Sequence, residues 1–225
     1  MISVLKWEQL LRHHVVTNHQ KCYMSVFPKQ YISAVFKKEK QKELVESGED
    51  LKLVHIPIKP ARNNDTSSVF HDDLISKYTN YIMRKGKKSL ARELLEKTFE
   101  NIKRTQLERY NLADAEEKEK IVTNPKLILH QAIANCRPLM ELTPIKRGGV
   151  KYQVPVAVTE NRSLFLAMNW LIQASKEKER NVHLPEKMAW ELLDAAAGQG
   201  RVVKRKNDLH RQCEANRAYA HYRWG

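Results

Sequence analysis

The side chains most suited to chemistry lie in residues 200–225, where cations alternate with aromatic rings. The charged and aromatic members that open and close this segment are Arg201, Lys204, Arg205, Lys206, Tyr222, Arg223 and Trp224. Cations neutralise phosphates and aromatic rings stack on unpaired bases, so this composition suits a nucleic-acid surface. A solvated helix face with an apolar end has the same composition, and the segment alone does not distinguish the two.

A helix is needed to present these side chains together. Asn207 or Asp208 is predicted to cap it, because such side chains accept backbone N–H groups and no proline or glycine follows before Gly225. Helical spacing then gives the segment an apolar side and a cationic side. The apolar side holds Leu209, Cys213 and Ala220 with Asn216 between them, and the cationic side holds His210, Arg211, Arg217 and His221.

The chain as a whole is strongly basic. Its 225 residues include 40 Lys and Arg against 26 Asp and Glu, a formal net charge of +14. Such a surplus repels itself in a compact protein and indicates an anionic partner. A membrane surface is the competing anion, but no apolar run approaches the ~18 residues of a spanning helix. Nucleic acid is therefore the predicted partner.

Disulfide and metal chemistry have little support in the sequence. Cys22, Cys136 and Cys213 are widely separated, odd in number and without a CxxC pair, which favours a reducing compartment. His130 and His210, taken with the last two cysteines, fit no standard zinc spacing. A core histidine and buried thiols are expected instead, and no metal or other cofactor is predicted.

Catalytic motifs are missing as well. The chain has no GxSxG, HExxH, Walker or dinucleotide pattern, and its acids and histidines are scattered. It is therefore predicted not to be an enzyme. An RNA-processing nuclease remains the enzymatic alternative, because its carboxylates could meet only in the fold.

The composition divides the chain into three parts. Residues 1–36 are basic and poor in acids, which predicts a mitochondrial presequence, with an ordinary amphipathic helix as the alternative. Their apolar helical stripe runs through Val4, Trp7, Leu11 and Val15. Residues 37–70 predict a short mixed-charge helix followed by an extended N-terminal arm, and residues 71–225 the main domain.

The main domain is predicted to be mainly α, a single domain of about six helices with one protruding β-hairpin. Apolar periodicity starts the first helix at His71, and Gly86 is predicted to cap its C-terminal end. A second helix fades near Tyr110 and leads into a charged, solvated connector at residues 111–120.

The later helices have clear start signals. Asn124 as N-cap with Pro125 at the first helical position starts the third helix. Its predicted buried face is Leu127, Ile128, Ile133 and Cys136. The fourth helix opens at residue 161 or 163 and carries the strongest apolar stripe, which predicts the central core helix. Pro185 starts the fifth, two glycines stop it, and the closing segment forms the sixth.

A β-hairpin is predicted between the third and fourth helices. β-Branched and aromatic residues flank a turn at residues 146–149, with arms at about 139–143 and 150–158. Pro155 in the second arm suits a two-stranded ribbon and not a central strand. The tip carries Lys146, Arg147 and Lys151, so we expect it to protrude and contact an anion; a surface hairpin without function is the alternative.

Three stretches together resemble the small-subunit ribosomal protein seven family of bacteria and organelles. They are DDLISKYTNYIMRKGKKSLARELLEKT at 72–98, RGGVKYQVPVAV at 147–158 and KRKNDLHRQCEANRAYAHYRW at 204–224. The first carries the family's Gly-Lys-basic triplet, the second its Gly-Gly hairpin and the third its closing basic helix. Tyr78 departs, standing where the family usually has Phe or a smaller apolar residue. The acid-poor start, the N-terminal extension and the end just after Trp224 resemble the mitochondrial branch.

The resemblance implies a structural RNA-binding role without catalysis, in the small subunit of the mitochondrial ribosome. The family folds on the 3′ major domain of small-subunit ribosomal RNA, helps nucleate head assembly and borders the messenger and exit-tRNA path. The implied partners are that RNA, neighbouring head proteins, and exit-site tRNA and messenger RNA. The implied location is the mitochondrial matrix.

The RNA-facing residues are expected in four groups. After the first helix come Arg84, Lys85, Lys87 and Lys88, and in the hairpin Lys146, Arg147, Lys151, Tyr152 and Gln153. The closing helix contributes Lys204, Arg205, Lys206, His210, Arg211, Asn216, Arg217, His221, Tyr222 and Arg223. Arg162 stands alone at the start of the fourth helix, where bacterial members tend to have several cations, so RNA contact there is left open.

A helix-turn-helix DNA regulator is the alternative binding protein, with the fifth and sixth helices as its motif. It would need polar, base-reading side chains early on the recognition helix and would be expected to show dimer symmetry.

Overall fold

A computed structural model describes residues 27–28, 30–61, 65–119 and 121–224. Most of the predicted presequence lies outside these residues. The described chain falls into two compact units, one ending at His71 and the other beginning at Asp72.

The first unit contains the short mixed-charge helix that the sequence predicts. Helix α2 (Lys38–Ser47) ends at Gly48, whose left-handed backbone (φ +67°) lets its N–H reach the Val45 carbonyl. A single turn, α3 (Asp50–Leu53), follows. A turn follows α3, and a parallel bridge joins Ile32 to Ile58.

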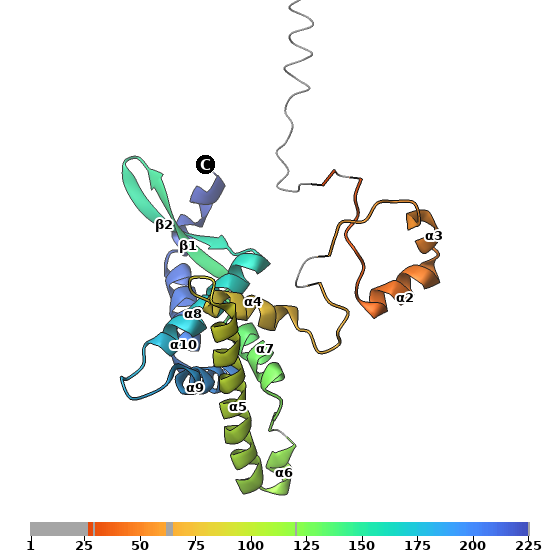
Figure 1. The fold of residues 1–225 in the computed structure, drawn as a ribbon. Helices are drawn as coiled ribbons and strands as arrows, with labels where there is room; N and C mark the ends of the chain where they lie inside the picture. The colour runs from red at the N-terminus through yellow and green to blue at the C-terminus, as the bar shows by residue number, and fades with distance from the viewer. Residues whose placement is uncertain (1–26, 29, 62–64, 120, 225) are drawn as a thin grey trace, which may run out of the picture. The chain divides into compact units, whose positions relative to one another are not determined.

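The second unit is a helical body with one hairpin, which confirms the predicted fold class (Figure 1). Its helices are α4 (Asp73–Ile82), α5 (Lys88–Leu112), α6 (Ala115–Lys118), α7 (Pro125–Cys136), α8 (Glu160–Lys176), α9 (Leu184–Ala196) and α10 (Gly200–Ala215). Strands β1 (Met140–Arg147) and β2 (Val150–Ala157) pair antiparallel and project from the body. A 3₁₀ helix, η1 (Arg217–Trp224), ends the described chain and packs beside β2.

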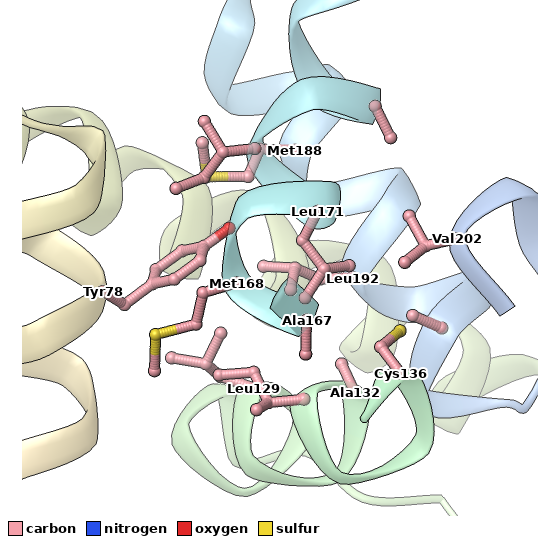
Figure 2. Packing of buried hydrophobic residues seen from close by; sticks show 14 of the residues in the cluster. Tyr78, Leu129, Ala132, Cys136, Ala167, Met168, Leu171, Met188, Leu192 and Val202 are labelled. Atoms are coloured by element: carbon pink, nitrogen blue, oxygen red, sulfur yellow. The ribbon is translucent and has the colours of Figure 1, made fainter. Parts of the chain in front are cut away.

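The core of this unit lies where α8 and α9 meet their neighbours (Figure 2). Helix α8 packs against α4, α7, α9 and α10, and α9 packs against α5, α7, α8 and α10. Leu129, Met168, Leu171, Met188 and Leu192 are fully buried between them. The predicted central helix, α8, therefore shares that position with α9.

Capping residues explain why two of the helices begin where they do. Asn124 caps α7 as predicted, since its side-chain oxygen accepts the Lys126 N–H at 3.0 Å. Asp72 caps α4 in the same way, accepting the Leu74 and Ile75 N–H groups. Polar side chains at these positions replace hydrogen bonds that the first turn cannot make within the helix.

The hairpin is longer than the sequence suggested. Strand β1 continues through Pro144 to Arg147, so Gly148 and Gly149 alone make the turn. Both have positive φ, +55° and +85°, which a two-residue turn of type I′ requires. Pro155 pairs with Leu142 within the ribbon, as a two-stranded sheet permits.

Several predicted helix boundaries were wrong, and the closing helix was predicted to continue to the end of the chain although α10 ends at Ala215 and the 3₁₀ helix η1 follows. Helix α10 begins at Gly200 and not at residue 207 or 208, because buried Val202 and Val203 continue its apolar stripe back through the basic run. Helix α4 ends at Ile82, where Met83 turns extended, so Gly86 lies in the following turn and does not cap it. Helix α8 begins one residue before Asn161, with Thr159 as N-cap.

Two predicted core positions need correction, and the connector, whose described residues are mostly exposed as predicted, contains helical residues that the sequence did not indicate. Leu127 is 57% exposed, because the buried face of α7 runs through Ile128 and Leu129 instead. His130 is no core histidine: it lies on the outer side of α7, where its Nε2 is 2.5 Å from the Asp72 carboxylate. The connector at 111–120 holds the end of α5 and the one-turn helix α6.

Tyr78 is the least compensated polar side chain of the core. Its ring is 0% exposed, and its hydroxyl has no hydrogen-bond partner among the described residues. Burial raises the pKa of this hydroxyl far above its usual value. A buried donor left without a partner costs about 1–3 kcal/mol.

We expect Tyr78→Phe to keep or raise the free energy of unfolding, by up to about 1 kcal/mol, because it removes the hydroxyl and keeps the ring. Tyr78→Leu, which removes the ring, should lower that free energy by about 2 kcal/mol or more through a cavity. Thermal and denaturant unfolding of the full chain measure both. A marked loss of stability in Tyr78→Phe would contradict the assignment.

Candidate nucleic-acid interface

The first basic surface is the turn between α4 and α5, which we call the basic turn (residues 84–88). Lys85 and Gly86 both adopt left-handed backbone, with φ +51° and +74°. Lys85 is the one described residue other than glycine with positive φ. A lysine gains nothing sterically from that conformation, which costs about 1 kcal/mol or more, so backbone strain coincides with a cluster of exposed cations.

The basic turn also leads into the N-terminus of a long helix. Lys87 is the N-cap of α5, makes no side-chain cap, and is followed by no acid in the first turn. The unpaired N–H groups of that turn attract anions, and the neighbouring cations reinforce the attraction. The arrangement suits a phosphate.

The second basic surface is the hairpin tip, formed by Lys146, Arg147 and Lys151. Lys146 lies directly opposite Lys151 in the strand register, and all three side chains are exposed. Like charges facing each other across two strands are destabilising in isolation. A bound anion would turn this repulsion into attraction.

A tyrosine cluster holds the hairpin against η1. The ring centroid of Tyr152 on β2 lies 5.2 Å from those of both Tyr219 and Tyr222, and Arg147 lies 4.9 Å above the Tyr222 ring. Tyr152 and Tyr222 are only partly exposed. Both were predicted to face RNA, and their contacts indicate that they also orient the hairpin.

The third basic surface is the outer side of α10. Arg201, Lys204 and Arg205 line a groove of about 450 Å³ whose inner wall is Trp170 on α8. Arg205 lies 5.0 Å from the Trp170 ring centroid and donates a hydrogen bond to the Gln173 Oε1 at 2.9 Å. An arginine positioned over an aromatic ring keeps other N–H groups available for phosphate binding.

Besides Arg205, three further predicted RNA-facing residues of α10 and its C-terminal cap make hydrogen bonds within the protein. The Lys206 ammonium donates to the Asn135 carbonyl at 2.6 Å, at the end of α7. The Leu139 N–H donates to His210 Nε2 at 3.1 Å. Asn216 caps the C-terminus of α10 and donates to the Gln212 carbonyl at 2.9 Å.

Two further cations are partly neutralised. The Arg162 Nε lies 3.3 Å from a Glu141 carboxylate oxygen, and the guanidinium also lies over Phe165. Arg201 lies 3.5 Å from Glu177 and 3.7 Å from buried Glu191. Sequence spacing could not reveal the carboxylate partners, because each lies outside the helix that carries its cation; Phe165 is on the same helix as Arg162.

The remaining predicted residues lie outside the core. Gln153 on β2 and Arg211, Arg217, His221 and Arg223 towards the end of the chain are exposed. Tyr219 was missed, although its spacing of three residues from Tyr222 places both on one side of a 3₁₀ helix. Trp224 was not assigned to RNA, yet its ring is 85% exposed beside Arg223.

The structure places the remaining reactive groups away from these surfaces. Burial raises the pKa of the Cys136 thiol to about 11 and also raises that of Cys213. Within residues 27–28, 30–61, 65–119 and 121–224, His, Cys, Asp and Glu side chains form no group suited to a metal ion. Over the same residues, no helix is both long and apolar enough to cross a membrane.

Comparison with known proteins places this arrangement in one family. A family model described as ribosomal protein S7p/S5e matches residues 54–217. The small ribosomal subunit protein uS7m of Drosophila melanogaster is 60% identical over 202 residues, covering 89% of this chain and 91% of that protein. The uS7m of Gallus gallus is 51% identical over 177 residues, covering 78% and 76%. The bacterial uS7 of Thermosipho africanus is 39% identical over 156 residues, covering 69% and 90%.

The backbone strain at Lys85 can be tested by substitution. Lys85→Gly and Lys85→Ala both remove one cation, so we expect the same loss of RNA affinity from each. Lys85→Gly should nevertheless be more stable than Lys85→Ala by about 1 kcal/mol, because only glycine adopts positive φ without strain. Denaturant unfolding and RNA titration of both variants measure this. Equal stability of the two variants would show that the strain is absent.

The hydrogen bond that His210 accepts should make the free energy of unfolding depend on pH. Burial lowers the pKa of His210 from its ordinary 6.5, and the charge of Lys206 lowers it further. Its neutral form accepts the Leu139 N–H, so this stabilisation is complete above about pH 6.5 and is lost as pH falls through the lowered pKa. The stability advantage of the natural chain over His210→Phe should therefore shrink between about pH 7.5 and about pH 5. Chemical unfolding at both pH values tests this, and a constant difference would contradict it.

Proposed function

The chain belongs to the family of ribosomal proteins S7p/S5e, and we propose that it is a structural constituent of the mitochondrial small ribosomal subunit that binds ribosomal RNA. The resemblance noticed in the sequence is confirmed by this membership, and so is the expectation that the chain is not an enzyme. The relatives named uS7m support a mitochondrial location.

The observation that carries RNA binding is the presence of three exposed basic surfaces on one helical unit. Within the described residues, no carboxylate pairs with Lys85, Lys146, Lys151 or Lys204. Cations without partners gain most from phosphates, because each contact releases counterions. A folded RNA with several strands in fixed positions could occupy all three surfaces at once, and its shape would supply the specificity.

Based on the family resemblance, we further propose that the three surfaces do not all bind the same nucleic acid. The basic turn and the α10 groove would bind the 3′ major domain of the RNA and support head assembly. The hairpin tip, which projects from the body, would lie towards exit-site tRNA and messenger RNA. Residues 71–225 would form the RNA-binding domain, residues 37–70 an arm, and residues 1–36 a presequence removed on import.

The DNA-regulator alternative is less well supported. Its recognition helix would be α10, whose first turn should present polar side chains to base edges. In that turn Val202 and Val203 are buried in the core, which leaves Arg201, already paired with Glu177 and Glu191, as the polar side chain. Duplex DNA should therefore fail to displace the protein from ribosomal RNA.

The α10 groove gives a quantitative test. Replacing Lys204 and Arg205 together by Ala should weaken binding of the full chain to a 3′-major-domain RNA fragment. The slope of log affinity against log salt should fall by about 1.4–1.8, since two phosphate contacts are lost. Lys206→Ala should mainly lower stability, because it leaves the Asn135 carbonyl without its partner. Filter-binding titrations and unfolding curves provide these measurements.

A matched control uses two cations of α5 that pair with acids one turn earlier, Lys97 with Glu93 and Arg104 with Glu100. The double variant Lys97→Ala, Arg104→Ala has the same charge loss and should change the slope much less. An equal change in both double variants would mean that net charge, and not the α10 groove, governs binding.

A further inference from the structure

We propose that an apolar pocket between α4, α5, α8 and α9 is a docking site for another protein of the small subunit. The pocket would receive an apolar side chain that has a carboxylate within one or two residues of it. This inference rests on the proposed function, because the partner is a neighbour in the same subunit.

The pocket has the size and lining of a side-chain site. Its volume is about 180 Å³, below the roughly 300–1,000 Å³ of small-molecule sites. Met83, Leu94, Ile172 and Leu184 form aliphatic walls, and Met188 is fully buried beside them. Leu90 lines the pocket from the first turn of α5 while remaining 49% exposed, so apolar surface extends from the pocket to the outside.

These walls suit an apolar side chain better than an RNA base. Bases are held by stacking on aromatic or guanidinium planes and by hydrogen bonds to their edges. No aromatic side chain lines the pocket, and its polar groups are confined to three cations. A base inserted among Leu94, Ile172 and Leu184 would bury its polar edge without hydrogen-bond partners. That burial costs free energy, and an apolar side chain avoids the cost.

The three cations indicate an acidic flank on the partner. Arg84, Lys87 and Lys176 line the pocket, and no carboxylate pairs with any of them in the part of the chain described. Burial lowers the pKa of Lys176, and repulsion from the charge of Arg84 lowers it further. A partner carboxylate would relieve this repulsion while its neighbouring side chain fills the pocket.

The basic turn therefore has two sides. Arg84 and Lys87 line the pocket, whereas Lys85 and Lys88 do not. The sequence grouped all four as one RNA-binding cluster. We assign Arg84 and Lys87 to a protein partner and leave Lys85 and Lys88 to RNA.

Site-directed crosslinking in assembled small subunits tests the assignment. Leu90→Cys is introduced into a full chain that carries Cys22→Ser; Cys136 and Cys213 are buried. The new thiol is labelled with a short photoreactive group in purified subunits, and crosslinked products are mapped by mass spectrometry and by primer extension. We expect a peptide of another subunit protein with an apolar residue within two positions of Asp or Glu. Crosslinks to RNA, to a peptide without an acid, or to nothing would overturn the proposal.

A charge-reversal variant provides a second test of the docking site. Adding Lys176→Glu to the labelled chain should reduce the yield of that crosslink at least about tenfold, because the anchoring cation becomes repulsive. Lys103→Glu should leave the crosslink yield unchanged. It makes an equal charge change at an exposed lysine of α5 that does not line the pocket. If the Lys176→Glu chain is not incorporated into small subunits, Lys176→Gln should still reduce the crosslink yield several-fold. An unchanged yield with the incorporated Lys176 variant would overturn the proposal.

RNA titration separates this inference from the proposed function. Lys176→Glu and Lys103→Glu should lower affinity for the RNA fragment to the same small extent. If the unmodified full chain fails to bind that RNA, the proposed function fails whatever the crosslinks show. If RNA binding holds while the crosslink goes to RNA, only the docking site fails.

Discussion

The hydrogen bond from the Lys206 ammonium to the Asn135 carbonyl joins α10 to the end of α7, and one turn later His210 accepts the N–H of Leu139. These two contacts fasten α10 to the segment that leads from α7 into the hairpin. The inner side of α10 is therefore structural, with Val202, Val203 and Cys213 buried beside it. Its outer side is free to carry the cations of the groove, so one helix both holds the fold together and presents charge.

The difference between the inner and outer sides of α10 explains why similar residues have different roles. Lys204 and Lys206 are two positions apart, which on a helix turns their side chains to different sides. One lines the outer groove and the other satisfies a helix-end carbonyl that would otherwise lack a partner. In the basic turn, which is not helical, the pocket makes a comparable distinction, because Arg84 and Lys87 line it and Lys85 and Lys88 do not.

Local signals predicted much of the fold, because their physical causes are local. Asn124 with Pro125 specified a helix start, and paired glycines specified a hairpin turn with two positive φ angles. The start of α10 was missed because its basic run was interpreted as a binding segment, although Val202 and Val203 continue the apolar stripe. The partners of His130, Arg162 and Lys206 lie at least 21 positions away, so only the tertiary structure could reveal them.

The position of the hairpin tip depends on α10. A two-stranded ribbon is marginal by itself, and opposed lysines at its tip weaken it further. Tyr152 compensates by packing against Tyr219 and Tyr222, and η1, which carries those rings, continues directly from α10. The direction of the tip is therefore set by α10 through the tyrosine cluster. Because α10 also forms the groove, α10 fixes the spacing between the groove and the tip. An RNA bound at both surfaces, as proposed, would therefore not pay a free-energy cost for ordering the hairpin.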